Sequence, residues 1–107
     1  MMAESDRRIL NLFAERVRAL YPDAKILAYG SRARGDATWE SDLDVCVILP
    51  AVTREMEDQI SHIAWGVGFD NEVLIMAFEF AQDDFDRRAA GRDPFVKNIL
   101  RDGVAAS

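Results

Sequence analysis

The sequence predicts a small α/β (α+β) protein in which a mixed β-sheet of about three strands is flanked by helices. Helical apolar spacing and short apolar runs of strand length alternate along the chain. Half of the residues are hydrophobic and 30% are charged, without a long Pro, Gly or Ser tract, so the composition is that of a folded chain. A length of 107 residues suits one compact unit, and we expect residues 1–107 to form a single domain.

The first half of the chain predicts an amphipathic helix, a short strand, a single helical turn and a second strand. The corresponding residues are 5–20, 25–29, 31–35 and 43–49. Apolar side chains recur at helical spacing in the first segment, and Pro22 follows its end. Gly30 interrupts the first strand and Pro50 stops the second.

The second half predicts a helix, a third strand and two further helices. The corresponding residues are about 53–65, 72–78, 82–90 and 95–102. We expect Gly66 and Gly68 to mark the end of the first of these helices. In the closing helix Asp93 suits the N-cap, Pro94 the first helical position and Gly103 the C-terminal stop.

Two aspartates stand at the start of the second strand, where apolar residues surround them. Because strand side chains alternate between faces, Asp42 and Asp44 point to one face while Leu43 and Val45 point to the other. Burying such charge is costly unless a cation or a partner compensates it. Two carboxylates on one face can share hard divalent cations, so the pattern predicts a metal site.

Charge and hydropathy limit the classes of partner. A net charge of -6 argues against a broad DNA- or RNA-binding surface, although Arg32 and Arg34 leave a local anion site open. The longest apolar runs have strand length and no signal-peptide pattern is present, so we expect a cytoplasmic protein without a membrane span. The lone Cys46 is interpreted as a core thiol.

The spacing of small and acidic residues resembles that of a known superfamily. Gly30-Ser31 is followed by ten residues and then by Asp42-x-Asp44, with Gly35 and Ser41 inside the spacer. This pattern is similar to the nucleotidyltransferase superfamily of DNA polymerase β, and specifically to the minimal nucleotidyltransferases. The likeness covers nearly the whole chain and implies the polymerase β-like nucleotidyltransferase fold.

The resemblance also implies roles for individual residues. Asp42 and Asp44 would hold two Mg²⁺ ions, because nucleotidyl transfer builds negative charge on the attacking and leaving oxygens. The backbone after Gly30 and the Ser31 hydroxyl would receive the triphosphate of ATP. Further nucleotide-binding candidates are Arg32, Arg34 and Ser41, and the sequence does not choose between the two arginines.

Active members of this superfamily use a third carboxylate on a neighbouring strand. Glu72 occupies the start of the expected third strand, where an aspartate is usual, and is the favoured third catalytic and metal ligand. Asp70, two residues earlier, is the alternative. That both are ordinary turn or strand-edge carboxylates stays open, and so does the activity of the protein.

These residues lead to an expected function with two alternatives. The first expectation is a Mg²⁺-dependent transferase that moves AMP from ATP to a hydroxyl of a partner protein. A protein acceptor is expected because the site and the core use most of the chain, which leaves no separate domain to enclose a smaller acceptor. The resemblance adds a co-encoded helical HEPN-domain ribonuclease as partner, in a toxin-antitoxin system. The alternatives are a non-catalytic nucleotide-binding subunit that neutralises its partner by occlusion, and a homo-oligomer that nucleotidylates a small molecule.

Overall fold

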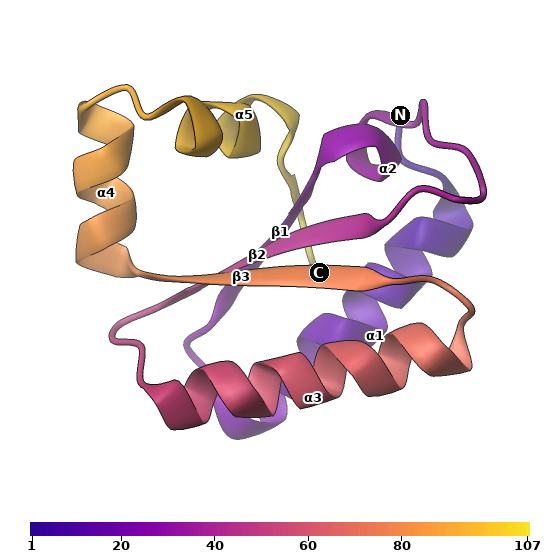
Figure 1. The fold of residues 1–107 in the computed structure, drawn as a ribbon, viewed down its shortest axis with the longest axis horizontal. Coiled ribbons are helices and arrows are strands. Elements are labelled where there is room, and N and C mark those ends of the chain that lie inside the picture. The colour runs from indigo at the N-terminus through magenta and orange to yellow at the C-terminus, as the bar shows by residue number, and fades with distance from the viewer.

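The computed structural model describes all of residues 1–107 and places a four-stranded sheet between two groups of helices (Figure 1). The helices are α1 (Glu4–Leu20), α2 (Gly30–Arg34), α3 (Arg54–Asp70), α4 (Gln82–Ala90) and α5 (Pro94–Asp102). The strands are β1 (Lys25–Tyr29), β2 (Leu43–Leu49), β3 (Ile75–Ala81) and β4 (Val104–Ala105). None of the helices combines the length and the hydropathy needed to cross a bilayer.

The strand order in the sheet is β3-β2-β1-β4. β1 is antiparallel to both β2 and β4, whereas β2 and β3 are parallel. The predicted mixed sheet is therefore confirmed, with one more strand than expected. β4 contributes only two residues, which is too short for a recognisable alternation of apolar and polar side chains.

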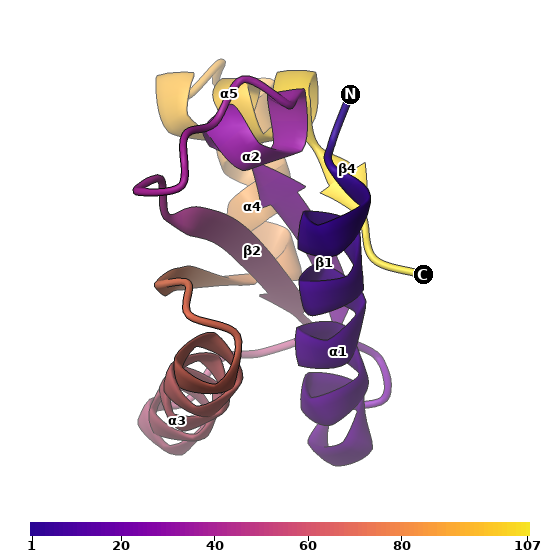
Figure 2. The same ribbon diagram turned by 90° about the vertical axis from the view of Figure 1, so that its right-hand side faces the viewer.

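The two faces of the sheet carry different helices. α1 and α3 lie on one face, and α4 and α5 lie on the other (Figure 2). The alternation of β2 divides its side chains between them, with Val45 and Val47 in the 18-residue core towards α1 and α3. Cys46 and Ile48 belong to a smaller, seven-residue cluster with α4 and α5. By the same alternation, Asp44 lies on the α4 and α5 face.

Most predicted boundaries agree with the structure to within a residue or two. β1, β2 and α4 have the predicted bounds, and α2 starts one residue early, at Gly30. The cap of α5 is confirmed, because the Asp93 carboxylate accepts hydrogen bonds from the backbone N–H groups of Phe95 and Val96.

The predicted end of the third helix is wrong. α3 continues through Gly66 and Gly68 to Asp70. Gly68 is needed for a close approach instead, since a Cβ atom there would lie 2.4 Å from the carbonyl oxygen of Val73. A glycine inside a helix costs only about 1 kcal/mol relative to alanine, which the packing of α3 offsets.

The predicted start of the third strand is also wrong. Because α3 is longer, residues 71–74 form the turn, and β3 starts at Ile75. Glu72 has a φ of 57° and is exposed in this turn. It therefore does not begin β3, which consists of residues 75–81 instead of the predicted 72–78.

Candidate functional site

The turn after β1 lies directly against the carboxylate of Asp44. Tyr29 ends β1 and is the cross-strand partner of Asp44 in the antiparallel register. Gly30 follows with a φ of +77°, and a Cβ atom there would lie 2.7 Å from Asp44 Oδ2. Glycine at this position permits both the backbone conformation and the short separation from the carboxylate.

The two aspartates carry negative charge that no cationic side chain neutralises. Asp42 is exposed and Asp44 is half-buried, and neither belongs to any of the ion pairs of the chain. Burial, and then the charge of Asp42, raise the pKa of Asp44. Burial and the charge of Asp44 likewise raise the pKa of Tyr29. A cation bound at this point would offset the cost of the charged carboxylates.

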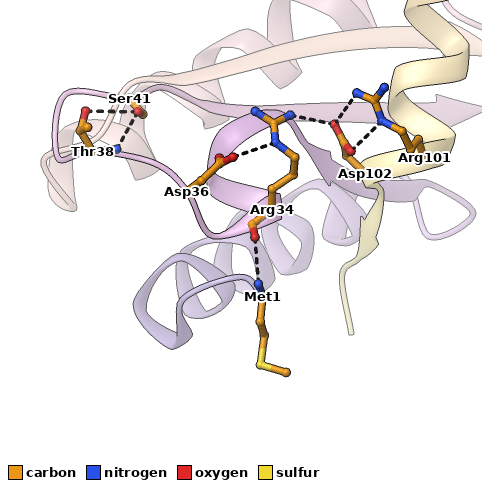
Figure 3. Close-up of polar contacts among 7 residues, drawn as sticks. All are labelled: Met1, Arg34, Asp36, Thr38, Ser41, Arg101 and Asp102. Atoms are coloured by element: carbon orange, nitrogen blue, oxygen red, sulfur yellow. Dashed lines mark hydrogen bonds and ion pairs between the residues drawn. The ribbon is translucent and has the colours of Figure 1, made fainter.

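Helix α2 carries the predicted phosphate-binding residues, and the N-terminal residue of the chain packs against it. Its second residue, Ser31, is half-buried, and the Ser31 carbonyl accepts a 3.0 Å hydrogen bond from the N–H of Gly35. Gly35 is left-handed, with a φ of +86°, and a Cβ there would overlap the backbone of Met1. The Met1 amine donates to the Arg34 carbonyl at 2.8 Å (Figure 3). These contacts fix the position of the turn relative to the sheet.

Arg32 connects α2 to α1 and to the loop that leads to Asp42. Its guanidinium donates to the Asp6 carboxylate at 2.8 Å, to the Ser41 carbonyl at 2.7 Å and to the Trp39 carbonyl at 3.2 Å. The Arg32 and Asp6 side chains are only 13% and 9% exposed. Because its donors are used within the protein, Arg32 positions the loop in this structure rather than presenting a free charge to a phosphate.

Arg34 and Ser41 are also engaged by neighbouring residues (Figure 3). Arg34 donates to Asp36 at 3.2 Å and to Asp102 of α5 at 2.9 Å. The Ser41 hydroxyl accepts from the Thr38 N–H at 3.0 Å, while the Ser41 N–H donates to the Thr38 carbonyl. Ser41 therefore closes a turn just before Asp42, and Arg34 links α2 to α5.

Residues 10–103 match the family model of the nucleotidyltransferase domain, which covers most of the chain. The chain belongs to the nucleotidyltransferase domain family. Nucleotidyl transfer is accordingly the general activity that the family match supports. No curated protein matches the sequence.

A solved structure shares the nucleotidyltransferase fold of the chain. A candidate nucleotidyltransferase from Sulfolobus solfataricus is 21% identical and superposes with a TM-score of 0.54. The alignment covers 95% of this chain and 82% of the other. At this identity the likeness concerns the fold alone, and it agrees with the arrangement of helices and strands described above.

Neither candidate for a third carboxylate, Glu72 or Asp70, lies on β3. The parallel register places Met76 of β3 beside Asp44, and Glu79 lies beside Val47 on the opposite face. Glu72 precedes β3 in the exposed turn, and Asp70 ends α3. No group of three His, Cys, Asp or Glu side chains is arranged to hold a metal ion. The structure thus brings Asp42 and Asp44 together with Gly30, but it does not add Glu72 or Asp70 to them.

The presence of Met76 beside Asp44 could not be read from the sequence. Shifting the start of β3 from 72 to 75 changes which residue is the cross-strand neighbour of Asp44. The register depends on where α3 ends, and the local signal at Gly66 gave the wrong end. A prediction that carried α3 through both glycines would have found it.

Asp42 and Asp44 provide two carboxylates of the kind that a divalent metal ion requires as ligands. Carboxylate oxygens are hard donors, and neither Asp42 nor Asp44 forms an ion pair within the chain. The missing side chain at Gly30 lets the backbone of the turn lie close to Asp44 Oδ2. Asp42 and Asp44 would hold such an ion, which would neutralise charge on a bound triphosphate.

Proposed function

We propose that this chain is a Mg²⁺-dependent nucleotidyltransferase that moves AMP from ATP to a hydroxyl of a partner protein. The observation that carries the proposal is the contact between Gly30 and Asp44, because these are the turn that we propose to bind phosphate and a carboxylate that we propose to bind the metal. Membership of the nucleotidyltransferase domain family supports the same class of reaction.

Each residue then has a defined role. Asp42 and Asp44 hold Mg²⁺, which neutralises charge on the triphosphate. The backbone N–H groups at the start of α2 and the Ser31 hydroxyl donate to phosphate oxygens. Arg32 keeps the loop before Asp42 in place through its bonds to Asp6 and to the loop carbonyls.

A protein acceptor suits the open surroundings of the aspartates. None of the five main surface hollows is lined by Asp42 or Asp44. Beside Asp44 the sheet presents Met76 and Phe78, which are 39% and 45% exposed. Such an open apolar surface suits a partner protein better than a small acceptor enclosed on all sides. From the resemblance to minimal nucleotidyltransferases we propose a helical HEPN-domain ribonuclease, encoded beside this chain, as the acceptor, with this chain as its antitoxin.

The proposal is tested by incubating the chain with ATP labelled at the α-phosphate, Mg²⁺ and the protein encoded by the adjacent gene. We expect label on that protein, and a mass gain of one AMP group by intact-protein mass spectrometry. Asp42→Asn combined with Asp44→Asn should abolish the label, whereas Glu40→Gln removes a nearby exposed charge and should leave it. Absence of label with a folded wild-type chain contradicts transfer to this partner.

A second variant tests the geometry directly. Gly30→Ala places a methyl group 2.7 Å from Asp44 Oδ2 and strains a φ of +77°, so we expect loss of the stabilisation that Mg²⁺-ATP gives in thermal denaturation. Gly66→Ala is the matched control, because nothing lies within 4 Å of a Cβ at that position. Equal stabilisation of Gly30→Ala and wild type by Mg²⁺-ATP would contradict the proposed cradle.

One observation favours a second candidate function, in which the chain binds a nucleotide but neutralises its partner by occlusion. Met76 stands beside Asp44, at a strand position where a third carboxylate would reach the same face. Under this function the Asp42→Asn and Asp44→Asn double variant still inhibits the partner, whereas a catalytic antitoxin loses inhibition together with label.

A further inference from the structure

A groove between the C-terminal part of α3 and the turn that leads into the edge strand β3 lies outside the site described above. Its volume is about 870 Å³, and most of the residues that line it are hydrophobic. Trp65 and Phe69 of α3 contribute to the groove together with Leu74, which precedes β3. A second, smaller hollow lined by Trp65, Leu74 and Met76 lies on the same border between α3 and β3. The two hollows extend along the edge of the sheet.

The aromatic side chains of α3 form an exposed, rigid surface. Trp65 is 65% exposed and Phe69 is 71% exposed. Their rings are stacked, with centroids 5.3 Å apart, one helical turn from each other. Large aromatic residues dominate the binding energy of protein interfaces because they bury much area at small entropic cost. An exposed stacked pair at a groove therefore indicates a protein-binding surface.

The edge of β3 continues this surface. β3 pairs with β2 on one side only, so its outer backbone groups are unpaired within the sheet. Exposed edge strands of monomeric proteins are normally short or protected by Lys, Pro, a bulge or an inward-pointing charge. The seven residues of β3 contain neither Lys nor Pro, and their one charged side chain, Glu79, lies on the face opposite Met76 and Phe78. Its exposed apolar side chains, Met76 and Phe78, are on the face that carries Asp44.

Negative charge at one end of the groove favours a partner with basic residues. Asp70 ends α3 and Glu72 lies in the following turn, where both are exposed and neither belongs to an ion pair. The last turn of α3 has no basic residue, so the negative end of the helix dipole adds to these carboxylates. A second copy would bring the same carboxylates and a net charge of -6, which disfavours self-association. A basic segment complements the groove.

We propose that this groove binds a segment of a partner protein that places an apolar side chain on Trp65 and Phe69 and an arginine or lysine at Asp70 and Glu72. Binding itself is independent of catalysis. That the bound protein is also the acceptor rests on the proposed function, and the register supports it, because a segment along β3 passes Met76, the neighbour of Asp44.

The test is a selection of phage-displayed random peptides on the intact chain, without nucleotide or metal. We expect enriched peptides that combine apolar residues with Arg or Lys. For a synthetic peptide of the enriched sequence, Trp65→Ser with Phe69→Ser should weaken binding at least about tenfold. Leu100→Ser, which removes an exposed apolar side chain of α5, is the matched control and should bind as wild type.

The charge component is tested with Asp70→Asn and Glu72→Gln. These exposed substitutions should weaken binding several-fold and reduce its salt dependence, because they remove the carboxylates that meet the basic side chains. Asp58→Asn, on an exposed position of the same helix, is the matched control. Circular dichroism of every variant confirms folding, and these charge variants remain informative if the aromatic double variant does not fold.

Several results would overturn the proposal. They are the absence of enrichment, enrichment of acidic peptides, equal binding by the aromatic double variant, and self-association that Trp65→Ser abolishes. The Asp42→Asn and Asp44→Asn double variant should bind the peptide as wild type. Peptide binding without nucleotidyl transfer would therefore reject the proposed function alone, and transfer without groove-dependent binding would reject this inference alone.

Discussion

The two faces of the sheet differ in how completely helices cover them. On the α1 and α3 face, 18 buried residues form a continuous core that includes Phe13 and Val45. On the α4 and α5 face, the cluster has seven buried residues, and the sheet around Asp44 and Phe78 is left partly open. The first face supplies most of the apolar burial, and the second supplies the exposed carboxylates and glycine turn of the candidate site.

This difference separates stability from function in a small chain. Residues on the covered face can be optimised for packing, because they do not meet a ligand. On the open face, the close contact between Gly30 and Asp44 restricts residue 30 to glycine for a reason other than core packing. We therefore expect substitutions on the covered face to affect mainly the stability of the fold. Substitutions on the open face should affect mainly the activity.

The largest expected effect on stability comes from the covered face. Phe13 is fully buried, so Phe13→Ala should lower the free energy of unfolding by about 3–5 kcal/mol. Phe78→Ala removes the same ring from the open face and should cost about 1 kcal/mol, because the ring is already largely hydrated. Urea denaturation of both variants measures the contrast, which disappears if the two losses are equal.

An intermediate effect is expected where the α1 helix supports the site. Asp6→Asn leaves the buried Arg32 guanidinium without its anionic partner and should cost about 3 kcal/mol. Asp36→Asn breaks the exposed pair with Arg34 and should cost less than about 1 kcal/mol. Hydrogen exchange should also show faster opening of residues 36–42 in Asp6→Asn, since Arg32 holds this loop; unchanged exchange there would argue against the positioning role.

The smallest expected effect on stability concerns Glu79, the one carboxylate on β3, which lies on the covered face. Burial, and then the charge of Glu57, raise the pKa of Glu79 to about 7. Because the pKa is higher in the folded than in the unfolded chain, ionisation of Glu79 costs stability as the pH rises from about 4.5 to 7. After allowance for solvent screening, Glu79→Gln should stabilise the chain by about 1 kcal/mol at pH 8.

The control for Glu79→Gln is the same variant at pH 4, where the native carboxyl is protonated and the two chains should be nearly equal in stability. Glu55→Gln, on an exposed position of α3, should show no such difference between the two pH values. A stabilisation of Glu79→Gln that does not depend on pH would show that packing, and not charge, is responsible.

The sequence was sufficient where the signal is local. Asp44 lies on β2, Asp42 lies just before it, and Gly30 directly follows β1, so alternation and turn chemistry placed Asp44 and Gly30 correctly. The same holds for Asp93 and Pro94 at the start of α5, because capping depends on adjacent residues.

The sequence was insufficient where a feature depends on distant residues. The place of Gly68 inside α3 depends on its contact with Val73, and the register of β3 depends in turn on the end of α3. The Arg32 to Asp6 pair joins residues 26 positions apart, so no local pattern distinguished Arg32 from Arg34. Tertiary packing therefore decided both the register of β3 and the contacts of the two arginines.

The burial of Cys46 provides a chemical reporter of unfolding. Its side chain is fully buried in β2, and burial, followed by the charge of Glu79, raises the pKa of the thiol to about 12. A folded chain should therefore resist alkylation, since the thiolate is the reactive form and the reagent has no access. As Cys46 is the sole thiol, the rate of its alkylation would report how often β2, the strand that carries Asp44, is exposed to solvent.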